Sequence, residues 1–203
     1  MIETFQGDRA IYRYVDLLAS VGTVRGLIGP REVPRLWDRH IRNCAAAAPA
    51  FPRGARVADV GSGAGLPGLV LAMARPDLRV TLIEPLLRRT TFLSEAVSEL
   101  GLTTVDVVRA RADDVVDTFD VVTSRAVAPL EKLLQWCLPL CRPGGLVLAL
   151  KGASAQAELD SVAALLRTRR ISAARVDEYP AGADGSTRVV RIESPMIGRT
   201  KKS

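Results

Sequence analysis

Short apolar runs alternate with longer amphipathic segments through the middle of the chain. Such runs predict buried strands, and apolar residues spaced three or four apart between them predict helices. The expected strands comprise a run with Val57, Ala58 and Val60, followed by residues 79–84, 105–108, 119–124 and 146–150. Helices are expected after the first strand and over residues 87–100 and 130–140. This alternation predicts a parallel sheet with right-handed crossovers.

The C-terminal third adds an antiparallel pair to the predicted sheet. A helix is expected over residues 154–169, followed by strands over residues 174–179 and 188–193. Asp184-Gly185 between these two strands is a hairpin signal. The chain is therefore expected to form an α/β fold with a Rossmann-like, seven-stranded, mostly parallel sheet.

The first 50 residues are expected to form a helical extension. One helix is expected over residues 8–21 and a second over residues 31–48, which ends before Pro49. The second helix carries arginines spaced to share one face: Arg31, Arg35, Arg39 and Arg42. Such a stripe fits either a phosphate-binding surface or a solvated face. The predicted division is an extension over residues 1–50, a sheet domain over residues 51–195 and a basic, disordered tail over residues 196–203.

A glycine-rich turn follows the first strand and leads into a helix. Gly61, Gly63 and Gly65 allow positive φ angles and close approach of the backbone to a ligand. Pro67 suits the first helical position, where no N–H is needed. A strand that turns into a helix N-terminus points backbone donors at a ligand, as in nucleotide sites of doubly wound sheets.

Two nucleotide motifs compete for this turn. Gly63, Gly65 and Gly68 satisfy the dinucleotide fingerprint G-x-G-x-x-G, and Glu84 follows at the distance of its ribose-binding acid. Counted from the end of the strand at Gly61, however, the third glycine position holds Leu66.

The frame that begins with an acid favours a different cofactor. Asp59 stands two residues before Gly61, and this pattern resembles the first motif of S-adenosylmethionine-dependent methyltransferases. Five parallel strands closed by a hairpin also suit a methyltransferase better than a dehydrogenase.

Residues just after the parallel strands are the candidate site residues, because ligands of such sheets bind outside the carboxyl ends of the strands. Glu84 is placed to accept the ribose hydroxyls, and the pair Ala112-Asp113 to read an adenine edge. Arg125 and Lys151 follow the fourth and fifth strands. Each of these residues, taken alone, is also compatible with a structural role.

The charge of the chain favours an anionic partner. The formal net charge is +6 and the pI is about 9.7, which makes nucleic acid the first candidate. Aromatic residues make up only 4%, so no extended base-stacking platform is expected. No long apolar stretch or secretory signal is visible, so a cytoplasmic protein without a membrane span is expected.

The cysteines are expected to be free thiols. Cys44, Cys137 and Cys141 are odd in number and lack metal-ligand spacing with His40, the single histidine. Neither a disulfide framework nor a metal site is therefore expected.

A closer resemblance covers nearly the whole chain in order. It is carried by Arg39-His40-Ile41, the segment 59–68, Arg88-Arg89 with Phe92-Leu93, Ser124-Arg125-Ala126 and Leu150-Lys151-Gly152. Together these motifs resemble the bacterial 16S ribosomal RNA guanine-N7 methyltransferases, also called the glucose-inhibited division protein B family. The resemblance implies S-adenosylmethionine contacts at Gly61, Leu66, Ala112, Asp113 and Arg125, and makes residues 51–195 a methyltransferase domain.

The full set of expected site residues follows from these two lines of argument. The cofactor-binding set is Asp59, Gly61, Gly63, Gly65, Leu66, Glu84, Ala112, Asp113 and Arg125. Arg125 and Lys151 are expected at the reacting centre, where either would hold the guanine O6 or a nearby phosphate. The RNA-binding set is Arg35, Arg39, His40, Arg42 and Lys151.

The expected reaction is direct displacement by guanine N7 on the methyl group, with 16S ribosomal RNA or the small ribosomal subunit as partner and a monomer as the enzyme. His40 fits either a role at the site or simple packing of the extension. The alternatives are a methyltransferase for a protein or small molecule, an NAD-dependent oxidoreductase, and a non-enzymatic RNA-binding module.

Overall fold

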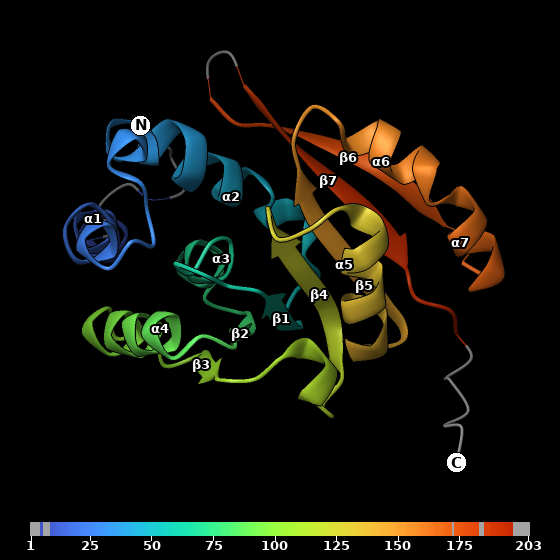
Figure 1. Cartoon of the computed structure of the whole chain (residues 1–203), viewed down its shortest axis with the longest axis horizontal. Coiled ribbons are helices and arrows are strands. Elements are labelled where there is room, and N and C mark those ends of the chain that lie inside the picture. The colour runs from blue at the N-terminus through green and yellow to red at the C-terminus, as the bar shows by residue number, and fades with distance from the viewer. Residues whose placement is uncertain (1–4, 6–8, 172, 183–184, 197–203) are drawn as a thin grey trace.

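The computed structural model describes residue 5 and residues 9–171, 173–182 and 185–196. Its centre is a seven-stranded sheet of order β3-β2-β1-β4-β5-β7-β6 (Figure 1). Strands β1 to β5 are parallel, and β7 is antiparallel to both β5 and β6. The predicted seven-stranded, mostly parallel sheet is thus confirmed. The strands are β1 Arg56–Val60, β2 Arg79–Ile83, β3 Val105–Val108, β4 Phe119–Arg125, β5 Cys141–Lys151, β6 Ala174–Pro180 and β7 Ser186–Glu193.

Helices cover both faces of the sheet and explain why its central strands are apolar on both sides. In β1, Val57 packs into one core, and Ala58 and Val60 pack into the other. The helices are α1 Arg9–Leu17, η2 Leu18–Gly22, η3 Pro30–Arg35, η4 Leu36–Ile41, α2 Arg42–Ala46, η5 Ala48–Ala50, α3 Gly68–Ala74, α4 Leu87–Glu99, η6 Ala112–Asp114, α5 Leu130–Cys137, η7 Leu138–Leu140, α6 Ala155–Ser161 and α7 Ala163–Thr168.

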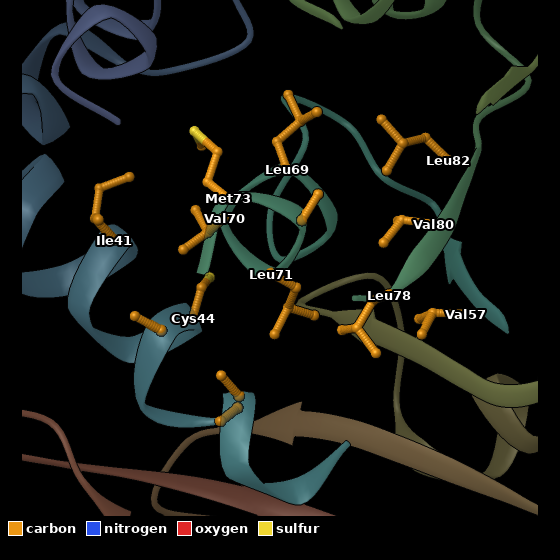
Figure 2. Close-up of a cluster of buried hydrophobic side chains, with 14 of the residues drawn as sticks. Ile41, Cys44, Val57, Leu69, Val70, Leu71, Met73, Leu78, Val80 and Leu82 are labelled. Atoms are coloured by element: carbon orange, nitrogen blue, oxygen red, sulfur yellow. The ribbon is translucent and has the colours of Figure 1, made fainter. Parts of the chain in front are cut away.

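The N-terminal extension packs into the same core as α3 and α4. Ile41 and Cys44 face the α3 side chains Val70 and Met73 (Figure 2), and all four are buried. α5, α6 and α7 cover the opposite face, around the core that includes Ala58 and Val60. The extension is therefore a structural part of the sheet domain's core, and it adjoins the glycine turn from one side.

The expected continuous helix over residues 31–48 is wrong. The segment consists of a 3₁₀ helix over Pro30–Arg35, a π-helix over Leu36–Ile41 and an α-helix over Arg42–Ala46. Pro34 lies inside the first piece, and its missing N–H prevents a regular α-helical ladder there. The spacing argument that aligned the four arginines on one helix face therefore does not hold.

Three further boundaries differ from the sequence-based expectation. The helix over residues 154–169 is divided at Val162, whose N–H donates to Leu159 O, three residues back, at 3.2 Å. β5 begins at Cys141, so the Pro143-Gly144-Gly145 segment lies within it, beside a register shift against β4. Helix α3 begins at Gly68, which places Pro67 one position before the helix.

Two predictions fall partly or wholly outside the described residues. These are the hairpin residue Asp184 and the tail beyond Met196. The cysteines are described, and all three are buried free thiols as predicted. Among the described helices, none is both long and apolar enough to cross a membrane.

Candidate active site

The glycine turn lies at the carboxyl edge of the sheet, and backbone hydrogen bonds join it to the end of β2. Gly61 N and Ser62 N both donate to Ile83 O, at 2.9 and 3.3 Å. Gly61 has φ +70°, and a Cβ placed on it would lie 2.7 Å from Val127 Cγ2. A side chain at this position would be both strained and in collision, so the turn requires glycine here.

Two adjoining cavities open above the turn. The larger, of about 570 Å³, is lined by Ser62, Gly63, Leu66, Glu84, Arg125 and His40, among others. The smaller, of about 250 Å³, is lined by Val60, Ile83, Ala112, Asp113 and Trp136, among others. Gly61, Pro85 and Val127 belong to both linings. The two cavities therefore form one continuous site, in which the larger cavity carries the charged side chains Glu84 and Arg125.

Glu84 lines the larger cavity, and hydrogen bonds hold its carboxylate in place. Its side chain is 2% exposed. One carboxylate oxygen accepts from Gly63 N at 3.0 Å and the other from Leu86 N at 3.1 Å. Arg89 Nη1 lies 3.4 Å from the same carboxylate. Each carboxylate oxygen can accept more than one hydrogen bond, so Glu84 can hold donor groups of a ligand without changing its position.

Asp59 lies beneath the turn and lines neither cavity. Its Oδ2 accepts from Gly68 N at 3.0 Å, at the start of α3, while Oδ1 has no partner among the described groups. Burial is the main reason that its pKa is raised to about 7. The structure thus places Asp59 as a support of the turn.

The other predicted cofactor residues lie either in the lining of one of the two cavities or within the turn itself. Gly61, Gly63, Leu66, Glu84 and Arg125 line the larger cavity, and Ala112 and Asp113 line the smaller one. Gly65 lies within the turn, and its N–H donates to Ser62 O at 2.7 Å.

Arg125 connects the end of β4 to the N-terminal extension. Its Nη2 donates to His40 Nδ1 at 2.6 Å and to Arg39 O at 3.2 Å, and its Nη1 lies 3.4 Å from Cys44 Sγ. His40 Nε2 lies in turn 2.9 Å from Glu32 Oε2. His40 is thus a wall residue of the larger cavity and a contact of Arg125.

Lys151 has its amine inside the protein. Its side chain is 9% exposed, and Nζ donates to Ala128 O and to Glu158 Oε2, both at 2.7 Å. The same Glu158 oxygen accepts from Leu130 N at 3.0 Å. These contacts hold residues 126–129, the loop that carries Val127 to the cavities. Lys151 itself lines neither cavity.

The predicted RNA-binding arginines lie in different surroundings. Arg39 Nη1 forms an ion pair with Glu32 Oε1 at 3.0 Å. Arg42 forms an ion pair with Asp38 and lies near Gly182, away from the site. Arg35 is exposed and forms no ion pair with a described carboxylate. Of the predicted RNA-binding set, the structure brings His40 alone to the cavity wall.

Two wall residues and one residue that supports the turn could not be assigned from the sequence. Tyr14 of α1 is fully buried, and its hydroxyl donates to Ala64 O in the turn at 2.8 Å. Val127 and Trp136 complete the smaller cavity. The helical spacing of Tyr14 marks it as a core residue, and no local signal shows that its hydroxyl reaches a turn 50 residues away.

The family model described as GidB, rRNA small subunit methyltransferase G, matches residues 8–184. A protein from Thermobifida fusca named ribosomal RNA small subunit methyltransferase G is 57% identical over 89% of this chain and 77% of its own length. A protein of the same name from Salinispora tropica is 56% identical over 96% of this chain and 85% of its own. This chain belongs to the GidB family.

The fold of this GidB family member is also found in more distant methyltransferases. A predicted O-methyltransferase from Agrobacterium tumefaciens matches with a TM-score of 0.59 and 18% identity, over 81% of this chain and 89% of its own. An rRNA methylase from Streptococcus thermophilus matches with a TM-score of 0.51 and 16% identity, over 75% and 93%. The similarity concerns the fold, and the predicted methyltransferase sheet is confirmed by it.

Proposed function

We propose that this chain transfers a methyl group from S-adenosylmethionine to N7 of a guanine in the 16S RNA of the small ribosomal subunit. The observation that carries the proposal is the pair of joined cavities at the glycine turn, on the carboxyl edge of a methyltransferase sheet in a GidB family member. Cavities of this size suit a nucleoside-containing ligand.

The residues of the two cavities fit the parts of S-adenosylmethionine. Gly63 lines the larger cavity, and a Cβ placed on it would meet only Gly61 O, at 3.8 Å, so the turn leaves room there for a ligand against the backbone. The carboxylate of Glu84 suits the two ribose hydroxyls. The smaller cavity, with Ile83, Trp136 and the Ala112–Asp113 pair, suits the adenine ring. Leu66 and Arg125 line the rest of the larger cavity and would contact the methionine part.

The proposed reaction requires alignment of the methyl donor with guanine N7, and it requires no proton transfer at N7. When bound, S-adenosylmethionine supplies a methyl group on a positively charged sulfur. Guanine N7 presents a free lone pair in the neutral base, so no general base is required. The contribution of the chain is to align the two reactants and to exclude water, which the partly enclosed site supports.

Arg125 and Lys151 have different proposed roles in this reaction. Arg125 lines the cavity and is placed to touch a reactant directly. Lys151 acts through the loop 126–129, because its amine is committed to Ala128 and Glu158. We therefore treat Lys151 as a positioning residue.

The RNA is proposed to approach over the extension, residues 1–50, toward the methyltransferase domain, residues 51–195. Arg31 and Arg35 flank Glu32, which contacts the cavity residue His40, and both are exposed. Their charges, within a net charge of +6, suit RNA phosphates. The protein is also proposed to act as a monomer in the cytoplasm.

The proposal is tested by incubating the protein with methyl-labelled S-adenosylmethionine and small ribosomal subunits that lack the modification. Label is expected in the RNA fraction, to be removed by ribonuclease, and transfer is expected to fall as salt rises. Label in the protein fraction that survives ribonuclease would overturn the RNA assignment. Binding of NAD with displacement of S-adenosylmethionine would instead support a dinucleotide enzyme.

A further inference from the structure

His40 has a defined partner on each ring nitrogen. Arg125 Nη2 lies 2.6 Å from Nδ1, and Glu32 Oε2 lies 2.9 Å from Nε2. The two partners come from distant parts of the chain, since Glu32 lies in η3 and Arg125 at the end of β4. The imidazole therefore bridges the extension and the wall of the larger cavity.

The chemistry of the partners fixes the tautomer of His40. A guanidinium only donates hydrogen bonds, so Nδ1 must accept with a free lone pair. The single proton of a neutral imidazole then lies on Nε2, where it donates to the carboxylate of Glu32. The contact with Arg125 exists only while His40 is neutral.

Arg125 carries a positive charge that no described carboxylate neutralises directly. Its contacts are neutral: His40 Nδ1, the backbone carbonyl of Arg39 and Cys44 Sγ. Three contacts from residues 39–44 hold the guanidinium in one orientation at the cavity wall. A fixed cation of this kind is suited to an anionic ligand group.

We propose that His40 is a positioning residue for cofactor binding, which holds the Arg125 guanidinium toward the carboxylate of the methionine part of S-adenosylmethionine. This inference rests on the proposed function, because that carboxylate is the one anionic group of the proposed cofactor. Glu84, at the same cavity, is suited to donors and not to this carboxylate.

Acid should release this arrangement. Protonation places a hydrogen on Nδ1, directly against the Arg125 N–H, so the bond is lost and two positive charges face each other. The charged groups around His40 are Glu32 of η3, Arg39 of η4 and Arg125 of β4. Burial and Arg125 together lower the pKa of His40 below its usual value of 6.5, while Glu32 opposes this shift. Cofactor affinity should therefore be constant above neutral pH and fall in the acid range.

The test is calorimetric binding of S-adenosylhomocysteine between pH 5 and 8, with 5′-methylthioadenosine as a probe that lacks the carboxylate. His40→Leu removes the acceptor and is expected to weaken S-adenosylhomocysteine binding by about tenfold at pH 8. It should leave 5′-methylthioadenosine binding unchanged. His40→Asn places an amide oxygen near the position of Nδ1, so it should restore most of the affinity and abolish the acid-dependent loss.

Glu32→Gln provides a second variant in case His40→Leu does not fold. Removing the negative charge that favours protonated His40 should move the acid loss of affinity to lower pH. Unchanged S-adenosylhomocysteine binding in His40→Leu, equal loss for both probes, or an unmoved pH midpoint in Glu32→Gln would overturn the inference. Failure of the wild-type protein to bind S-adenosylhomocysteine would instead refute the proposed function, whereas binding without RNA methylation would refute only its RNA part.

Discussion

At the scale of single residues, the site depends on a glycine whose hydrogen cannot be replaced. Gly61→Ala would add a methyl group 2.7 Å from Val127 Cγ2 at a φ of +70°. We expect S-adenosylhomocysteine binding to weaken by at least tenfold, measured by calorimetry, because the turn or Val127 must move into the cavities.

Gly101→Ala is the matched control for Gly61→Ala. Gly101 also has positive φ, +65°, but a Cβ there meets nothing within 4 Å and lies far from the turn. Both variants should lose about 1–2 kcal/mol of stability through left-handed strain. Equal cofactor affinity in the two variants would show that the close contact between Gly61 and Val127 does not affect cofactor binding.

Asp59 gives a pH dependence of stability with a definite sign. Its pKa is raised to about 7 in the folded protein, mainly by burial, against 3.8 in its unperturbed state. The folded state therefore binds the proton more tightly, and the contribution of Asp59 to stability is largest below pH 4 and is lost as pH rises toward 7.

Asp59→Asn should remove this loss. The free energy of unfolding of the variant relative to the wild type should increase between pH 4 and 7, by up to roughly 4 kcal/mol, and be flat above. Urea unfolding at a series of pH values measures it. A difference that is independent of pH would show that the Asp59 carboxyl is not perturbed.

Residue patterns predicted the turn and Glu84 because their signal is local. Glycines, an acid and a strand end lie within about 25 positions of sequence, and parallel pairing brings Ile83 next to Val60. The partners of Arg125 and Tyr14 are separated from them by 50 residues or more. Contacts of this kind depend on how the extension packs, which no periodicity encodes.

At the scale of elements, α1 is tied to the glycine turn by one buried hydroxyl. Tyr14→Phe would leave Ala64 O without its donor, which should cost about 1–3 kcal/mol. Because the turn is the proposed binding site of the cofactor, affinity for S-adenosylhomocysteine should fall as well. Thermal unfolding and calorimetry measure the two effects.

Tyr12→Phe on the same helix is the control. Tyr12 is 45% exposed, and its ring centroid lies 5.1 Å from that of Trp37. Its hydroxyl forms no hydrogen bond with a described residue. Its removal should change neither stability nor affinity by a measurable amount. If both variants behave alike, α1 does not support the turn through Tyr14.

Element boundaries were predicted best where propensity and packing agree. The central strands β1 and β4 are apolar runs buried on both faces, and their positions matched, whereas β5 begins five residues before the predicted 146–150. The segment 31–48 is rich in good helix formers, yet it has three different helical geometries: Pro34 lies in the 3₁₀ piece, and His40, which contacts Arg125, lies in the π-helical piece. Local periodicity describes the apolar face of such a segment but not its winding.

At the scale of the whole molecule, the net charge of +6 should appear in the salt dependence of RNA binding. Replacing Arg31 and Arg35 by Ala should lower the slope of log affinity against log salt by about 1–2. Arg167→Ala with Arg169→Ala, on and after α7, removes the same charge far from the extension. Equal slopes for the two double variants, measured by filter binding, would show that the extension does not contact phosphates.

The most direct test of the central claim is to map the methylated atom. Small subunits that lack the modification are treated with the protein and S-adenosylmethionine, and their RNA is then cleaved chemically at N7-methylguanine. We predict one new cleavage position in the 16S RNA, absent when the cofactor is omitted and strongly reduced with Gly61→Ala. Methylated RNA without cleavage at any guanine would contradict the assignment of N7 as the attacking atom.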